Sequence, residues 1–257
     1  MKRELQSAAA ARGRRRQPEA SRHAILAAAL AEFAQQGLAG ARMDAIADAA
    51  GVNKALLYYY FHSKDDLYGA VLRDFFVRLR SRIAKALESD SPAGVKILRY
   101  ARAHFDSVAE SPYYARLFQG EMMSAGRGGS PHFSHIISEY ITPIAQSVGA
   151  ELQQGIQSGE FRAVDPTQFA PTMAAIIVHY FAVSPVLRKL RGGDPYSPEA
   201  IAKRRAAVLD FIAAALFSDR EAGINLAARI ADLQQPIEDF AVPLPVPSVS
   251  AESRRRK

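Results

Sequence analysis

The sequence of 257 residues contains no cysteine. It can therefore form neither a disulfide framework nor a thiolate nucleophile, which fits a reducing compartment such as the cytoplasm. The patterns G-x-S-x-G and H-E-x-x-H are also missing, as is the Gly-Lys-Ser/Thr ending of a phosphate-binding loop. We therefore expect a cytoplasmic protein that is not an enzyme and needs no cofactor.

A long apolar segment of the kind that targets or spans a membrane is also lacking. Ala8 to Ala11 is shorter than the roughly 7 to 15 apolar residues of a signal peptide. Phe169 to Leu187 is a run of 19 residues without a formal charge, but Pro171, Pro185 and His179 interrupt it. We expect a helix of the core or of a subunit interface there, and no membrane partner.

The sequence shows no strict alternation of apolar and polar residues and no Asn-Gly hairpin signal. Apolar residues instead recur every three to four positions, as in amphipathic helices. This periodicity predicts an all-α fold. The predicted helices cover about residues 19–36, 43–50, 53–60, 64–88, 95–109, 112–123, 132–158, 166–190 and 198–217, with a short amphipathic helix within 219–235.

Capping residues and prolines punctuate these helices. Ser63 with Asp66 forms a capping box, and Asp165 and Ser197 each precede a proline that suits the first helical position. Prolines inside the predicted helices, at positions 143, 171 and 185, should kink or shift them. The proline-rich stretch 236–247 and the basic end 254–257 predict that the chain is mobile beyond the short helix within 219–235.

The charge of the chain is uneven. Lys and Arg total 33 and Asp and Glu total 26, a formal charge of +7. Residues 1–16 hold six basic residues and one acid, and so carry +5 of this surplus, whereas residues 17–64 are neutral overall. A basic arm of this kind is either a solvated, flexible tail or a contact to a polyanion such as nucleic acid.

The segment from Arg42 to Leu67 contains a helix-turn-helix pattern. Ala47 is small enough to let a second helix approach, Gly51 can take the positive φ of a tight turn, and Leu57 can anchor the second helix in the core. In this geometry the second helix enters the major groove of DNA while the first crosses the backbone. The spacing therefore predicts a DNA-binding head.

The same segment closely resembles the DNA-binding domain of TetR-type bacterial transcription regulators. The resemblance rests on Ile46-Ala47, Ala50-Gly51-Val52, Leu57-Tyr58, Tyr60-Phe61, Lys64 and Leu67, preceded by Phe33 and Gly37. It implies a three-helix head followed by a larger helical domain for effector binding and dimerisation. The expected domains are a basic flexible arm (1–18), the head (19–66), the effector and dimerisation domain (67–218) and a mostly flexible tail (219–257).

The side chains of the second motif helix suggest how DNA is read. With Asn53 as N-cap, the face not used by Leu57 holds candidate contacts to bases and phosphates. Tyr58 is expected in the core, because three successive tyrosines cannot all face one side. The candidate DNA contacts are Arg42, Asn53, Lys54, Ala55, Leu56, Tyr59, Tyr60 and Lys64, with Arg14, Arg15 and Arg16 of the arm.

Two of these candidates need comment. Lys64 begins a helix, where the helix dipole disfavours a cation, so a nearby phosphate explains it better than folding does. Relatives of this type usually carry a hydroxyl residue where this chain has Arg42 and Leu56. Arg42 can still reach a phosphate, whereas Leu56 cannot.

Dimerisation and effector binding are expected from the larger domain. A small head binds DNA tightly as a two-fold dimer on a palindromic operator. The candidate dimer residues are Ile176, Tyr180, Val208, Leu209, Ile212 and Leu216, with the core of the monomer as the alternative role. The candidate pocket for a small apolar or aromatic effector, each residue of which could also be ordinary core, is lined by His104, Phe105, Tyr113, Tyr114, Leu117, Phe118, Glu121, Met122, Phe133 and His179.

We therefore expect a homodimeric DNA-binding regulator, a repressor that a ligand releases from its operator. The alternative is a helical ligand-binding or scaffold protein without specific DNA binding. His132, His135 and Glu139 share a helical face, but this spacing without a third histidine or cysteine is weak evidence for a metal site, and we expect none.

Overall fold

A computed structural model describes residues 2–125 and 130–233, and the side chains of residues 18–111, 113–124, 130–190 and 192–233. Within these residues the fold is all-α, as predicted, and its one β-type contact is an isolated bridge between Phe161 and Phe217. The helices are α1 (Lys2–Gly40), α2 (Met43–Ala50), α3 (Lys54–Tyr60), α4 (Lys64–Leu87), α5 (Ala93–Ala109), α6 (Pro112–Ala125), α7 (Pro131–Ile136), η1 (Ile137–Ile141), α8 (Thr142–Gln157), α9 (Pro166–Ala182), α10 (Ser184–Arg191), α11 (Pro198–Leu216) and α12 (Arg220–Ala231).

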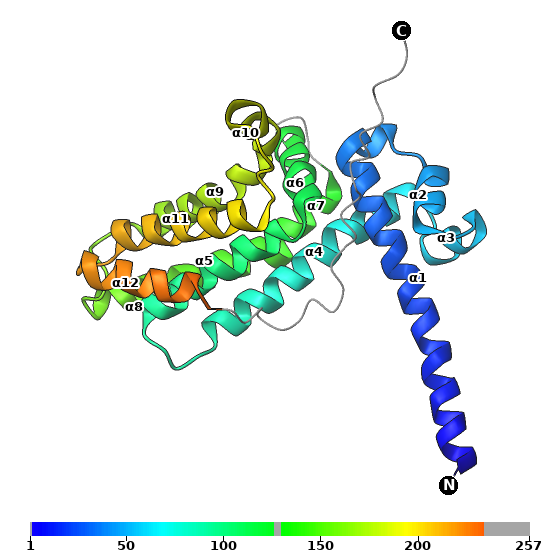
Figure 1. The fold of residues 1–257 in the computed structure, drawn as a ribbon, viewed down its shortest axis with the longest axis horizontal. Helices are drawn as coiled ribbons and strands as arrows, with labels where there is room; N and C mark the ends of the chain where they lie inside the picture. The colour runs from blue at the N-terminus through cyan, green and yellow to red at the C-terminus, as the bar shows by residue number, and fades with distance from the viewer. Residues whose placement is uncertain (1, 126–129, 234–257) are drawn as a thin grey trace.

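Helix α1 is longer than expected. It begins at Lys2 rather than near residue 19, so the backbone of residues 2–18 is helical where we predicted a flexible arm. Alanine, leucine, glutamine and arginine are strong helix formers, and they make up most of this segment. Gly37, which follows the predicted helix end at residue 36, has a φ of 68° and marks a kink near the end of α1. Figure 1 shows α1 as a long rod with the N-terminus at its free end.

Prolines divide two helices that we predicted as continuous. The helix expected over 132–158 contains the π-helical turn η1 just before Pro143, whose missing N–H leaves the carbonyl of Glu139 without its usual donor. The helix expected over 166–190 breaks before Pro185, and α9 and α10 meet there at 60°. The N-caps Ser63, Asp165 and Ser197 each accept a backbone N–H, as predicted.

The larger domain is built around α5. This helix packs against α4, α8, α9, α11 and α12, and α4 runs from this body into the head (Figure 1). Fully buried side chains such as Leu98, Phe105 and Leu152 form the core. None of the described helices is by itself long and apolar enough to cross a membrane. The predicted tail beyond residue 233 lies outside the described residues, and α12 confirms the short helix before it.

Candidate nucleic-acid interface

The turn between α2 and α3 closes as the sequence predicted. Gly51 has φ 66° and ψ 29°, the left-handed conformation that glycine adopts without steric cost. The N–H of Gly51 donates to the carbonyl of Asp48 at 3.1 Å, and the N–H of Val52 donates to that of Ala47 at 3.0 Å. These two bonds satisfy the last carbonyls of α2 and fix the direction in which the chain leaves it.

Helix α3 is fixed at both ends. The side-chain oxygen of Asn53 accepts the N–H of Leu56 at 2.7 Å, which confirms Asn53 as the N-cap. Leu57 is fully buried and Phe61 is 2% exposed, and both pack in one core with Ile46. The anchored face of α3 therefore determines which of its side chains point to solvent.

The solvent face of α3 presents donors and one large aromatic ring. Tyr59 is 76% exposed, and Lys54 and Ala55 are exposed beside it. The ammonium of Lys54 lies 2.7 Å from the carboxylate of Asp44 on α2. The hydrogen bond from Lys54 lowers the pKa of Asp44, and the same bond raises the pKa of Lys54. Leu56 is half-buried and contributes less to this surface.

The tyrosines are distributed differently from the prediction. Tyr58, expected in the core, is 39% exposed, while Tyr60 is half-buried, packs against the core and lies 6.4 Å from the ring of Phe61. The reason is the 100° step between successive helical residues, which leaves both neighbours of Tyr59 at the border of the exposed face. Tyr59 is thus the most exposed of the three tyrosines.

Lys64 has a structural role that the sequence did not reveal. Its ammonium donates to the carbonyl of Ala39 at 2.9 Å and to that of Ala41 at 3.1 Å, at the end of α1. Folding therefore accounts for this lysine, contrary to our expectation that a phosphate explains it better. A phosphate contact through its remaining proton stays a prediction.

The other predicted contacts lie at the edges of the head. The side chain of Arg42 is exposed and makes no capping bond, while its backbone N–H donates to the carboxylate of Glu32 at 3.1 Å. The side chains of Arg14, Arg15 and Arg16 lie outside the described part of the chain. Sequence reasoning missed Glu32 and Asp44; an acid in the first turn of α2 was the available signal for Asp44.

The predicted effector pocket is only partly assembled. Tyr114, Leu117 and Phe133 are buried, and the ring of Phe118 packs against that of Phe133. The ring of Tyr114 packs against Phe75 and Phe76 of α4. The other predicted residues lie apart from this cluster or at its border. Glu121 is buried near it, Tyr113 is half-buried, Phe105 packs on Phe181, and His104 lies beside Tyr100, whereas Met122 is 56% exposed and His179 is exposed.

Most of the predicted dimer residues belong to the core of a single chain. Val208, Leu209, Ile212 and Leu216 are at most 2% exposed within one protomer, so they have no surface to offer a partner. The apolar stripe of α11 was real, but the protomer's own helices cover it. Ile176 and Tyr180 are half-buried, and the Arg204 guanidinium lies 5.1 Å from the Tyr180 ring.

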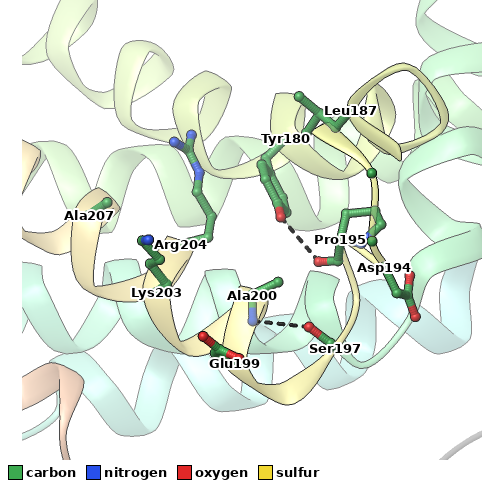
Figure 2. Close-up of a pocket in the computed structure, with 12 residues that line it drawn as sticks. Tyr180, Leu187, Asp194, Pro195, Ser197, Glu199, Ala200, Lys203, Arg204 and Ala207 are labelled. Carbon is green, nitrogen blue, oxygen red and sulfur yellow. Dashed lines mark hydrogen bonds between the residues drawn. The ribbon is translucent and has the colours of Figure 1, made fainter. Parts of the chain in front are cut away.

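A cleft of about 460 Å³ lies elsewhere, between α9, α10 and the start of α11. Figure 2 shows Tyr180, whose hydroxyl donates to the carbonyl of Pro195 at 3.1 Å, facing Lys203 and Arg204 of α11. The walls of the cleft also include Gly192, Gly193 and the acids Asp194 and Glu199. This cleft contains none of the residues predicted for the effector pocket.

Comparisons with known proteins agree with the geometry of the head and of the body. Residues 25–71 match the model of bacterial regulatory proteins of the tetR family, and residues 95–212 match the model of the tetracyclin repressor-like C-terminal domain. The HTH-type transcriptional regulator RutR of Escherichia coli K12 is 31% identical over 179 residues, which cover 70% of this chain and 82% of RutR. The HTH-type transcriptional repressor SCO4008 of Streptomyces coelicolor is 30% identical over 183 residues, which cover 70% and 88% of the two chains.

The solved structure of the ketosteroid transcriptional regulator KstR2 of Mycobacterium tuberculosis has the same fold. It superimposes with a TM-score of 0.58 at 22% identity, covering 82% of this chain and 92% of KstR2. The helix-turn-helix head, both family models and the sequence relatives lead to one conclusion. The chain belongs to the TetR family of bacterial transcriptional regulators.

Proposed function

We propose that this regulator is a cytoplasmic repressor that binds a palindromic operator as a homodimer and leaves it when a small ligand binds. The observation that carries the proposal is that α3 is held in one orientation, with the same side chains exposed to solvent. Its N-cap Asn53 and its anchor Leu57 hold Lys54, Ala55 and Tyr59 on one solvent face. A short helix fixed in this way can enter a major groove with its N-terminal residues against the bases.

Each exposed side chain of α3 suits a different part of DNA. Lys54 can donate to the acceptor edge of a guanine, and the methyl group of Ala55 can contact a thymine methyl. The hydroxyl of Tyr59 can donate to a phosphate, as can the guanidinium of Arg42 at the start of α2. Base contacts would select the operator, whereas the phosphate contacts would set the register of the head.

The basic N-terminal segment would add affinity without selectivity. It carries +5 over residues 1–16, and its backbone continues α1 away from the head (Figure 1). Each phosphate that it neutralises adds about 0.9 to the slope of log affinity against log salt concentration. Removing residues 1–16 should weaken binding to every DNA sequence and flatten this slope, and an unchanged slope would exclude the contact.

Dimerisation through α9 and α11 remains the proposal, but with a different face. Phe211 on α11 is 57% exposed, and Ala207 one turn before it is also exposed. On α9, Ala175 and His179 are likewise exposed and lie one turn apart. Small residues around one large apolar side chain let two helices approach closely. Phe211→Arg should yield monomers in sedimentation, while Leu190→Arg on α10, a control at a still more exposed apolar residue, should leave dimers.

The decisive test of the proposal is selection of DNA from a random library, followed by titration of the selected duplex and of a scrambled duplex. A repressor of this type should prefer a palindrome by about 1,000-fold or more. Lys54→Ala should reduce this preference, whereas Lys203→Ala, an exposed lysine on α11, should not. Equal affinity for all duplexes would instead support a helical ligand-binding or scaffold protein.

A further inference from the structure

A carboxylate is buried where the effector domain meets the head. Glu121 on α6 is 5% exposed. One carboxylate oxygen accepts the hydroxyl of Tyr68 on α4, and the other accepts the hydroxyl of Ser130, the N-cap of α7, at 2.7 Å. Three helices therefore meet at one acidic side chain. Figure 1 shows α6 and α7 on the side of the body that faces α1.

Folding alone does not account for an acid in this position. A buried carboxylate loses its hydration, and two neutral hydroxyls compensate only part of that loss. No lysine, arginine or histidine of the described residues lies within ion-pair distance of Glu121. An apolar side chain of similar volume would serve packing better. The described residues therefore place no countercharge beside this carboxyl group.

The surroundings of this carboxylate are aromatic. The ring of Tyr68 packs edge-on against Phe33 of α1 at 5.0 Å. Tyr114 stacks near Phe118, which in turn meets Phe133 at 5.5 Å. The Tyr114 hydroxyl is buried and has no hydrogen-bond partner in the described structure. Burial raises the pKa of Tyr114, and the nearby Glu121 adds to that rise, which places the two groups in one neighbourhood.

We propose that Glu121 is the binding group for a cationic effector, a protonated organic amine that carries an aromatic or apolar body. An ammonium supplies both the missing charge and N–H donors for the carboxylate, and aromatic ring faces attract cations. The unpartnered hydroxyl of Tyr114 can accept a second N–H of the same group. This inference rests on the proposed function and names the chemistry of its ligand.

Binding at Glu121 also explains how the head would respond. The Tyr68 hydroxyl already occupies one carboxylate oxygen, so an entering ammonium must displace it. Tyr68 lies on α4, one turn after Lys64, which holds the end of α1. Releasing Tyr68 removes a link between the effector domain and the helix that carries the head. The amine therefore needs only to prefer the released state to lower operator affinity.

The test compares ligands that differ in charge but not in shape. Phenethylamine with 2-phenylethanol, and 1-naphthylmethylamine with 1-naphthalenemethanol, are titrated into the full chain by calorimetry at neutral pH. At least one amine should bind ten-fold or more tightly than its alcohol. Glu121→Gln, which keeps an oxygen acceptor for Tyr68, should abolish this preference. Glu139→Gln, which removes an exposed acid of η1, should keep it.

A second variant tests the competition with Tyr68. Tyr68→Phe removes the internal donor but keeps the ring against Phe33, so it should bind the amine several-fold more tightly than the unchanged protein does. Equal binding of amine and alcohol, or a preference that survives Glu121→Gln, would overturn the site. Unchanged amine affinity in Tyr68→Phe would overturn the displacement. Calorimetry needs no DNA, so these outcomes are separate from a failure to bind an operator.

Discussion

Lys54 and Asp44 form an ion pair across the turn of the helix-turn-helix, with the ammonium 2.7 Å from the carboxylate. Both side chains are more than half exposed, so the pair contributes little to stability. Its position matters more, because it puts a negative charge on the surface that would face phosphates. DNA must therefore compete with Asp44 for the candidate base-reading lysine.

Removing that competitor should make DNA binding stronger and less selective. In Asp44→Asn, Lys54 is free to contact any phosphate, and one repulsive charge is lost. Affinity for scrambled duplexes should rise several-fold, and the salt slope should steepen by about 0.9, the value for one more phosphate contact. Fluorescence anisotropy over a range of salt concentrations measures both quantities.

Asp48 provides the matched control for this prediction. It is an exposed acid on the same helix, and its side chain has no ion pair with Lys54. Asp48→Asn changes the net charge by the same amount and leaves the pair intact. Equal effects of the two substitutions would show that only net charge matters, and would contradict a specific role for the pair.

Replacing Lys64 by methionine should destabilise the fold. The ammonium donates to two carbonyls at the end of α1, and hydrogen bonds to charged groups contribute about 1.5 to 3 kcal/mol each, less at this half-buried site. We expect Lys64→Met to lower the free energy of unfolding by about 1 to 3 kcal/mol, measured by urea titration. Lys54→Met should change it by less than about 0.5 kcal/mol, as surface substitutions do. If Lys64→Met unfolds like the unchanged protein but binds DNA weakly, the lysine serves phosphate instead.

The local elements were predictable because their signals are local. Ser63, Asp165 and Ser197 cap helices where the sequence placed them, and Gly51 forms the turn. The acceptors of Lys64 were not predictable, because they lie 23 and 25 residues away. The role of the apolar stripe of α11 was not predictable either. Periodicity shows that a helix face is buried, but not whether the same chain or a partner covers it.

The stability of the protein should fall in mild acid because of His104. Burial lowers its pKa to about 4, below the ordinary value of 6.5. As the pH falls, His104 therefore takes up a proton in the unfolded chain before it does so in the folded chain. Its contribution to the free energy of unfolding is complete above about pH 6.5 and is lost as the pH falls toward 4. The loss is roughly 3 to 4 kcal/mol at most, from about 1.4 kcal/mol for each unit between the two pKa values. Urea titrations between pH 7 and pH 4 measure it.

Two substitutions distinguish the effect of His104 on stability from the effects of the other groups that titrate in this range. His104→Gln keeps a hydrogen-bonding side chain beside the Tyr100 hydroxyl, which lies 3.3 Å from the His104 ring nitrogen. Its stability should vary less between pH 6.5 and 4 than that of the unchanged protein. His135→Gln, which replaces an exposed histidine, should keep the full variation. A profile unchanged in His104→Gln would mean that folding does not lower the pKa of His104.

Gly223 in α12 should not tolerate even a methyl group. A Cβ added there would lie 2.6 Å from Cγ of Phe217 and 2.7 Å from its Cβ, and a rotamer change cannot move the Cβ. Gly223→Ala should therefore push α12 away and cost about 1 to 3 kcal/mol, despite the better helix propensity of alanine. Gly149→Ala in α8, where no atom lies within 4 Å, should instead stabilise by about 0.5 to 1 kcal/mol. Urea unfolding of the two variants measures the difference, and an equal gain in both would show that α12 does not approach Phe217 this closely in solution.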